Sequence, residues 1–357
     1  MSRLPLRLAA DIVSANLTRR ALPYKVTLVA TYRCNFRCEM CSIWQKPHLG
    51  EMTPAEVESF FRAWSQFSWV HLTGGELFVR RDFEDIVAAL VEGDRALYLL
   101  NFPTTGWFGD RTVALVERTL RRGIGRLMTT ISIDGPPETH DEMRGLPGSW
   151  DRAVETLGRL RGVRRRNFQV VAGMTLFARN ASLVDATIAA IRGRVRDFER
   201  TDLHLNIGHE SAHYFANDGY LGQPRTHAQP VIDAIDEHRS AIGRSFHPVR
   251  FLEDRYQALV RTYYQTGKSP LPCAALTSSC FIDPSWDLYP CSIWNQRLGN
   301  LREQHFDLRA LWESDSTNGV RQQVIEEHCP HCWTPCEAYP TILGNVARAA
   351  LPAGSGS

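Results

Sequence analysis

The sequence predicts an α/β fold with a parallel sheet, followed by a smaller cysteine-rich region. Between residues 24 and 207, six apolar strand-like runs alternate with amphipathic helix-like segments. Strands that alternate with helices form βαβ units, whose strands pair in parallel. All nine cysteines fall at 34–41 or 273–336, which indicates that the C-terminal region has a separate role.

The predicted strands span 24–30, 70–73, 96–102, 127–133, 168–176 and 202–207. Thr53 and Glu56 form a capping box with Pro54 at the first helical position, which predicts the start of a helix. Apolar spacing predicts further helices at 81–92, 110–120, 149–160 and 181–191, with Ser149 as a helix cap. Ligands of such sheets bind at the carboxyl ends of the strands.

The composition gives no support for nucleic acid or a membrane as a partner. The 357 residues carry a net charge of +2, and no apolar stretch reaches the length of about 18 residues that a membrane span requires. Residues 1–22 mix leucines with arginines, which predicts an amphipathic helix packed on the fold rather than a secretory signal. We therefore expect a cytoplasmic protein whose reduced thiolates bind metal.

Cys34, Cys38 and Cys41 form a C-x3-C-x2-C loop directly after the first predicted strand. Three thiolates in one short loop can hold three irons of a cubane, which leaves the fourth iron without a protein ligand. Structural zinc sites more often use four ligands, commonly as pairs of C-x2-C. The loop therefore predicts an iron–sulfur cluster with one iron open to a small molecule.

This loop, with Phe36 before its second cysteine, resembles the signature of radical S-adenosylmethionine (radical SAM) enzymes. Gly74-Gly75-Glu76 follows the apolar run 69–73 and resembles the GGE motif of the same family. The resemblance implies a partial (βα)6 TIM-like barrel, in agreement with the six predicted units. It also implies a [4Fe-4S] cluster whose open iron binds SAM, and an external one-electron donor such as flavodoxin or ferredoxin.

The resemblance further implies several contacts to SAM. The backbone of Gly74 and Gly75 would meet the amino group, because glycines allow close approach, and Glu76 would help to hold it. Ser132 would face the ribose or the carboxylate. Arg144, in a segment that resembles the HDxxRG segment of the family, would pair with the carboxylate. The alternative for Arg144 is an ion pair with a neighbouring acidic residue, Asp141 or Glu142.

Polar residues at other strand ends are further candidates. Asn101 ends the third predicted strand and Asn206 the sixth, where each could contact nucleoside or substrate, or cap a turn. Residues 206–214 concentrate polar and titratable groups that could supply substrate contacts or a proton acceptor.

The C-terminal cysteines resemble the SPASM/twitch extension of radical SAM enzymes. Cys273 and Cys291 flank a predicted hairpin, and Cys329, Cys332 and Cys336 follow. The resemblance implies that Cys273, Cys291, Cys329 and Cys332 bind one auxiliary [4Fe-4S] cluster, with Cys280 and Cys336 spare. Two alternatives stay open: Cys336 replaces Cys329 or Cys332, or the C-x2-C pair binds zinc.

Trp286 departs from the pattern of the full SPASM extension, which has a glycine five positions before the closing cysteine of the hairpin. The whole pattern predicts five parts of the chain. These are an N-terminal helical extension (1–22), the partial barrel (23–228), a helical connection (229–270), the SPASM/twitch-type domain (271–345) and a tail (346–357).

The resemblance implies that SAM is cleaved to a 5′-deoxyadenosyl radical, which abstracts hydrogen from an unactivated C–H bond. Only about 23 residues precede the first strand, too few for a peptide-binding domain, so we expect a small natural-product or sugar-like substrate. Net oxidation through the auxiliary cluster is the preferred outcome. The alternatives are a radical epimerase with Cys280 as hydrogen donor, a peptide-modifying maturase and, least favoured, a non-catalytic iron–sulfur sensor.

Overall fold

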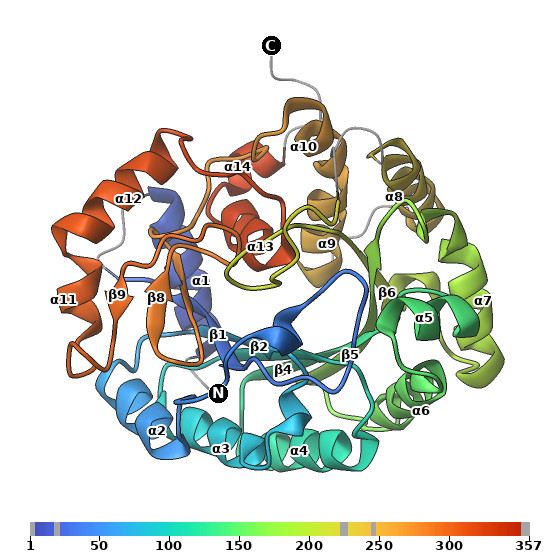
Figure 1. Cartoon of the computed structure of the whole chain (residues 1–357), viewed down its shortest axis with the longest axis horizontal. Helices are drawn as coiled ribbons and strands as arrows, with labels where there is room; N and C mark the ends of the chain where they lie inside the picture. Colours follow the sequence, from blue (N-terminus) through green and yellow to red (C-terminus); the bar gives the residue numbers. More distant parts are fainter. Residues whose placement is uncertain (1–3, 18–21, 222–227, 244–247, 351–357) are drawn as a thin grey trace.

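The computed structural model describes residues 4–17, 22–221, 228–243 and 248–350, which form a curved, nine-stranded sheet covered by helices (Figure 1). The strand order is β6-β5-β4-β3-β2-β1-β7-β8-β9. The strands are β1 (Lys25–Thr31), β2 (Trp69–Gly74), β3 (Leu99–Thr104), β4 (Arg126–Ser132), β5 (Phe168–Leu176), β6 (Leu203–Ile207), β7 (Ser279–Ile282), β8 (Asp287–Tyr289) and β9 (Gly299–Asn300).

The predicted partial barrel is confirmed. Each strand from β1 to β5 pairs in parallel with the next one along the chain. The helices that follow these strands lie on the outside of the sheet in Figure 1. They are α2 (Pro54–Ala63), α3 (Phe83–Gly93), α4 (Gly109–Arg121), α6 (Ser149–Arg161), α7 (Val184–Arg194) and α8 (Ala228–Ile242).

The two faces of β1 differ in polarity. Val26 and Leu28 are fully buried in the same core cluster as Phe60 of α2 and Ile86 of α3. The alternate residues Lys25 and Thr27 are also fully buried, and the Lys25 Nζ donates to Thr27 Oγ1 over 2.7 Å. Because side chains alternate across a strand, apolar residues face the helices and polar ones face the barrel interior.

The C-terminal region extends the same sheet. β7 pairs in parallel with β1, and β8 and β9 follow in antiparallel. The remaining helices are α9 (Pro248–Ala258), α10 (Val260–Thr266), α11 (Leu308–Trp312), α12 (Asp315–Ile325), α13 (Pro335–Leu343) and α14 (Val346–Ala349). Figure 1 shows α9 and α13 across the open side of the curved sheet.

Trp286 lies at the tip of the β7–β8 hairpin with a left-handed backbone, at a φ of 69°. This conformation costs a residue other than glycine roughly 1–2 kcal/mol. The indole is fully buried, and its ring centroid lies 5.0 Å from that of Phe60 and 5.1 Å from that of Phe306. Burial of so large a ring outweighs the backbone cost, which explains how Trp286 replaces the expected glycine.

The prediction that Ser149 caps α6 is wrong. Gly148 is the N-cap residue, and its φ of 77° suits a glycine. The Asp141 carboxylate accepts hydrogen bonds from the Gly148 and Trp150 N–H groups and from the Ser149 hydroxyl. Asp141 belongs to α5 (Pro137–Arg144), a helix that apolar spacing does not predict.

The N-terminal helix α1 (Leu4–Leu17) is attached to the C-terminal region through Asn16. The Asn16 side chain donates to the Leu343 carbonyl over 2.6 Å and accepts from the Val346 N–H over 3.0 Å. Part of the predicted tail, 346–349, is helical, and 351–357 lie outside the described residues. None of the helices in the described part of the chain is long and apolar enough to cross a membrane.

We expect Trp286→Ala to lower the free energy of unfolding by about 3–5 kcal/mol, because it leaves a large cavity beside Phe60. Chemical denaturation followed by circular dichroism measures the change. Leu49→Ala is the control, since Leu49 is 86% exposed and its loss should cost less than about 0.5 kcal/mol. Equal stability of the two variants would contradict the role given to the indole.

Candidate active site

A cavity of about 290 Å³ lies at the carboxyl ends of the barrel strands. The three predicted cluster cysteines line it, together with Gly74, Gly75, Ser132 and Arg144. From the sixth strand end and the C-terminal region, the lining includes Asn206, His209, Ser292 and Cys336. The structure therefore brings most of the predicted site residues together.

The loop with Cys34, Cys38 and Cys41 follows β1 and rests on the end of α5. The Arg37 N–H donates to the Arg144 carbonyl over 3.3 Å, and the Glu39 N–H donates to the Met143 carbonyl over 2.9 Å. Burial raises the pKa of the Cys34 thiol to about 12 and that of Cys41 to about 11. The thiols therefore need a bound cation to ionise at neutral pH, which is what iron provides.

Gly74 and Gly75 hold the end of β2 against this loop. The Gly75 N–H donates to the Thr31 carbonyl, and the Glu76 N–H donates to the Arg33 carbonyl, each over 3.0 Å. A Cβ on Gly74 would lie 2.4 Å from the Thr31 oxygen, and one on Gly75 would lie 2.2 Å from the Arg33 oxygen. These close backbone contacts require glycine at both positions, whether or not a ligand is bound.

The Glu76 side chain is fully buried and is not among the residues that line the cavity. Its carboxylate accepts hydrogen bonds from the Thr104 hydroxyl over 2.9 Å and from the Thr105 N–H and hydroxyl over 2.7 Å each. Direct contact of this carboxylate with the SAM amino group does not agree with its placement. Glu76 instead fixes the end of β3, where Thr104 and Thr105 themselves line the cavity.

Arg144 pairs with Asp134, and neither Asp141 nor Glu142 is its partner in the structure. The Arg144 Nη2 lies 2.6 Å from Asp134 Oδ2. Burial raises the pKa of the Cys38 thiol, and the nearby Arg144 guanidinium offsets part of this rise. Its buried Nε has no hydrogen-bond partner. Arg144 therefore brings a positive charge with an unused donor into the cavity beside a cluster cysteine.

The two asparagines differ in position. Asn206 lines the cavity, as does Ser132. Asn101 lies deeper in the barrel, where it accepts from the Trp69 indole over 2.7 Å and is 2.5 Å from His71 Nδ1. Nucleoside contact by Asn101 therefore does not agree with the structure, because its amide is used in a buried network.

The run 206–214 contributes both cavity residues and structural ones. His209 and Tyr214 line the cavity, and the His209 Nε2 is buried without a partner. Burial lowers the pKa of His209 to about 4, so the ring is neutral at physiological pH. His213 instead contacts the Cys291 carbonyl over 3.1 Å and stacks on Tyr289 at 4.6 Å.

Cys273, Cys291, Cys329 and Cys332 line one small cavity in the C-terminal region. Burial raises the pKa of Cys273 and of Cys291 well above the ordinary thiol value, and the nearby Cys332 raises both further. The four thiols that the resemblance groups into one auxiliary site thus line one cavity, although they are spread over 60 residues of the chain.

The two other C-terminal cysteines lie elsewhere. Cys280 is fully buried in the main hydrophobic core, opposite Val26 in the register of β7 with β1. This places it on the helix-facing side of the sheet, so a hydrogen-donor role does not agree with its position. Cys336 lines the main cavity and not the four-cysteine cavity, which argues against its replacing Cys329 or Cys332 as a ligand.

Both groups of cysteines offer sulfur donors alone. Each thiolate of a cubane binds a different iron. The thiol-only donor sets at both places therefore agree with clusters.

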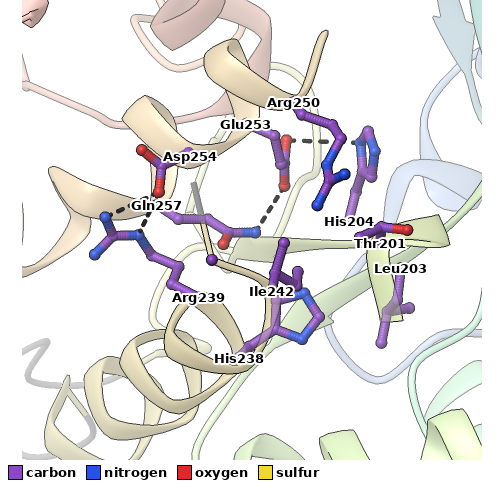
Figure 2. Close-up of a pocket in the computed structure, with 11 residues that line it drawn as sticks. Thr201, Leu203, His204, His238, Arg239, Ile242, Arg250, Glu253, Asp254 and Gln257 are labelled. Carbon is purple, nitrogen blue, oxygen red and sulfur yellow. Dashed lines mark hydrogen bonds and ion pairs between the residues drawn. The ribbon is translucent and has the colours of Figure 1, made fainter. Parts of the chain in front are cut away.

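A second pocket, shown in Figure 2, lies around the start of β6 between α8 and α9, away from the cysteine loop. Its volume is about 30 Å³, enough for little more than one water molecule. Asp254 pairs with Arg239 over 3.0 Å, and Glu253 lies 3.6 Å from His204. The Asp254–Arg239 ion pair joins α9 to α8, and the small volume does not indicate a binding site.

Comparison with known proteins agrees with this geometry. A model of the radical SAM superfamily matches residues 28–187, and a model of the SPASM iron–sulfur cluster-binding domain matches 273–333. The chain therefore contains a radical SAM domain and a C-terminal SPASM domain. The first domain implies a [4Fe-4S] cluster and SAM, and the second implies auxiliary iron–sulfur binding.

Curated relatives are distant. The subtilosin biosynthesis protein AlbA of Bacillus subtilis is 22% identical over 87% of this chain, which spans 65% of the length of AlbA. An AdoMet-dependent heme synthase of Methanosarcina barkeri is 24% identical, with 82% of each chain covered. Streptococcus suis SuiB, solved with S-adenosylmethionine, has a TM-score of 0.61 at 13% identity over 87% of this chain and 70% of SuiB. The SuiB likeness shows a shared fold.

We expect Gly75→Ala to lower the iron content after anaerobic reconstitution, because its Cβ would displace the Arg33 carbonyl and with it the cysteine loop. Iron per chain, measured colorimetrically, reports the effect. Gly319→Ala is the matched control, since a Cβ at Gly319 meets no atom within 4 Å. If Gly75→Ala retains as much iron as Gly319→Ala, the glycine contact does not position the loop.

Proposed function

We propose that this protein is an enzyme that uses SAM to abstract hydrogen from an unactivated C–H bond of a polar, uncharged substrate. The observation that carries this proposal is the cavity that holds the three-cysteine loop, the Gly74–Gly75 backbone and Arg144 together. A cluster with bound SAM supplies the 5′-deoxyadenosyl radical, and the chain supplies binding, orientation and exclusion of water.

Cys34, Cys38 and Cys41 are the proposed ligands of the SAM-binding cluster. Cys273, Cys291, Cys329 and Cys332 are the proposed ligands of one auxiliary cluster, since they share a separate cavity. The free state of all nine cysteines supports a reducing, cytoplasmic environment. A flavodoxin or ferredoxin is the proposed class of electron donor.

Arg144 and Ser132 are the proposed contacts to SAM. The unpaired Nε of Arg144 can donate to the SAM carboxylate while Nη2 stays on Asp134. Gly74 and Gly75 offer their backbone beside the cysteine loop. Glu76 takes part indirectly, because it positions Thr104 and Thr105.

The lining supports a neutral substrate rich in hydroxyl or amide groups. Away from the Asp134–Arg144 pair, the polar groups are mainly hydroxyls and amides, such as Thr130, Asn206 and Ser292. A small natural-product or sugar-like molecule remains the preferred class. A peptide is the second candidate, because AlbA is named for the biosynthesis of a bacteriocin and SuiB has also been solved with its precursor peptide SuiA.

Two fates of the substrate radical agree with this site. The first is net oxidation, with the auxiliary site as electron acceptor. The second is return of a hydrogen atom from the protein. Formation of 5′-deoxyadenosine above the SAM-only background, measured against panels of neutral sugars and of uncharged peptides, identifies the substrate class. Absence of 5′-deoxyadenosine with and without these compounds would overturn the proposed enzyme activity.

We expect about eight irons per reconstituted chain, from two cubanes. Replacement of Cys34, Cys38 and Cys41 together by Ala should remove about half of this iron, because the second site is separate. Elemental analysis measures iron and zinc in the same sample. Full iron retention by the triple variant, or zinc at the C-terminal site, would show that the ligand assignment is wrong.

We expect Arg144→Ala to weaken SAM binding about tenfold to hundredfold, because it removes a charge-assisted hydrogen bond. Isothermal titration of reconstituted enzyme measures the affinity. Arg179→Ala is the control: Arg179 is on the same side of the barrel but pairs with Glu39 and Glu142 outside the cavity. Equal affinities in the two variants, with iron retained, would exclude Arg144 as a SAM ligand.

A further inference from the structure

The start of α13 carries a cysteine that neither proposed cluster uses. Cys336 is the second residue of this helix and lines the main cavity with the three loop cysteines. Lys25 on β1 is fully buried, and its Nζ donates a hydrogen bond to the Cys336 carbonyl over 2.5 Å. A cysteine on a helix that is anchored to the central strand has a fixed position relative to the site.

The chain segments that separate the two cavities include an unpaired hydroxyl group, which indicates a ligand in the cavity that Cys336 lines. This wall consists of Cys291–Ser292 and Cys332–Cys336, with one end of each segment in each cavity. The Thr334 hydroxyl lines the main cavity and lies 3.9 Å from the Cys332 sulfur. Ser292 is 1% exposed, lines the main cavity, and its hydroxyl has no hydrogen-bond partner. An unpaired buried hydroxyl costs free energy unless a ligand satisfies it.

Cys336 also lies close to the cluster loop. The Tyr214 hydroxyl lies 2.7 Å from Thr73 Oγ1, next to Gly74. Burial raises the pKa of Tyr214, and the nearby thiols of Cys336 and Cys41 raise it further, so both thiols lie near this one hydroxyl group. Burial likewise raises the pKa of Cys336 to about 11, which keeps its sulfur protonated.

We propose that Cys336 is the catalytic hydrogen-atom donor of this site and returns hydrogen to a carbon radical held between the cysteine loop and Ser292. This inference rests on the proposed function. It makes the net reaction an inversion at carbon rather than an oxidation, with the donor on the part of the cavity wall that α13 supplies.

The step balances as follows. The Cys336 S–H bond breaks homolytically and the new C–H bond forms, which leaves a thiyl radical on Cys336. One electron and one proton restore the thiol, and the external one-electron donor of the flavodoxin or ferredoxin class supplies the electron. The substrate loses one hydrogen atom and gains one, so it is neither oxidised nor reduced.

The first test uses iodoacetamide on reconstituted holoenzyme, in which the cluster cysteines are protected by iron. At pH 9, where a larger fraction of the Cys336 thiol is ionised, we expect peptide mapping to find Cys336 labelled slowly and Cys280 unlabelled. SAM at roughly ten times its Kd should slow the labelling of Cys336 about tenfold, because it fills the same cavity. Labelling of neither cysteine, or labelling that SAM does not change, would overturn the placement of Cys336 at the site.

The second test needs only SAM, reductant and D2O. Thiol hydrogen exchanges with solvent, so the 5′-deoxyadenosyl radical formed without substrate should take deuterium from Cys336. We expect mass spectrometry to show deuterated 5′-deoxyadenosine in the wild type and in Cys280→Ala, and loss of the label in Cys336→Ala. Cys336→Ser keeps the side-chain size but has a stronger O–H bond, and it should also lose the label while it retains wild-type iron.

The outcomes separate this inference from the proposed function. Unlabelled 5′-deoxyadenosine in the wild type, or label that persists in Cys336→Ser, overturns the hydrogen-donor role and leaves the enzyme activity intact. Loss of iron in Cys336→Ser assigns Cys336 to a cluster and overturns the role as well. No 5′-deoxyadenosine in any sample overturns the proposed function itself.

Discussion

Two backbone hydrogen bonds between the end of β2 and the cysteine loop determine the geometry of this site. They run from the Gly75 and Glu76 N–H groups to the Thr31 and Arg33 carbonyls. Only residues without a Cβ allow the two chains to come this close at Gly74 and Gly75. The loop is thereby held over the carboxyl edge of the sheet, where the ends of the other strands also lie.

The buried Lys25 side chain fixes the position of the C-terminal region relative to the barrel. Lys25 is fully buried, and its Nζ donates to Thr27 on its own strand and to the Cys336 carbonyl on α13. A buried charge is expensive unless it is well hydrogen-bonded. Lys25 lies on β1, the strand that leads into the loop of Cys34, Cys38 and Cys41. Its hydrogen bond to α13 therefore fixes the C-terminal cysteine region relative to this loop.

The sequence was sufficient for the features that depend on local patterns. Strand and helix alternation predicted the six βα units. Cysteine spacing predicted the first loop, and the resemblance to the SPASM/twitch extension implied which C-terminal thiols gather at the second cavity. Local patterns did not predict the placement of side chains whose direction depends on distant partners. Cys280 faces the helices because β7 pairs with β1 in a register that sets Ser279 against Lys25, which no local pattern reveals. Glu76 turns toward Thr104 and Thr105, and Asn101 toward Trp69, for the same reason. The unpaired Ser292 hydroxyl beside the cavity carries no sequence signal at all.

The central claim is that two separate cysteine sites hold two clusters and that only the first binds SAM. Electron paramagnetic resonance of the reduced, reconstituted enzyme tests it directly. The wild type should show signals of both clusters, with one of them shifted by SAM. The variant with Cys34, Cys38 and Cys41 replaced by Ala should keep one signal, unchanged by SAM. A SAM-sensitive signal in that variant would contradict the account.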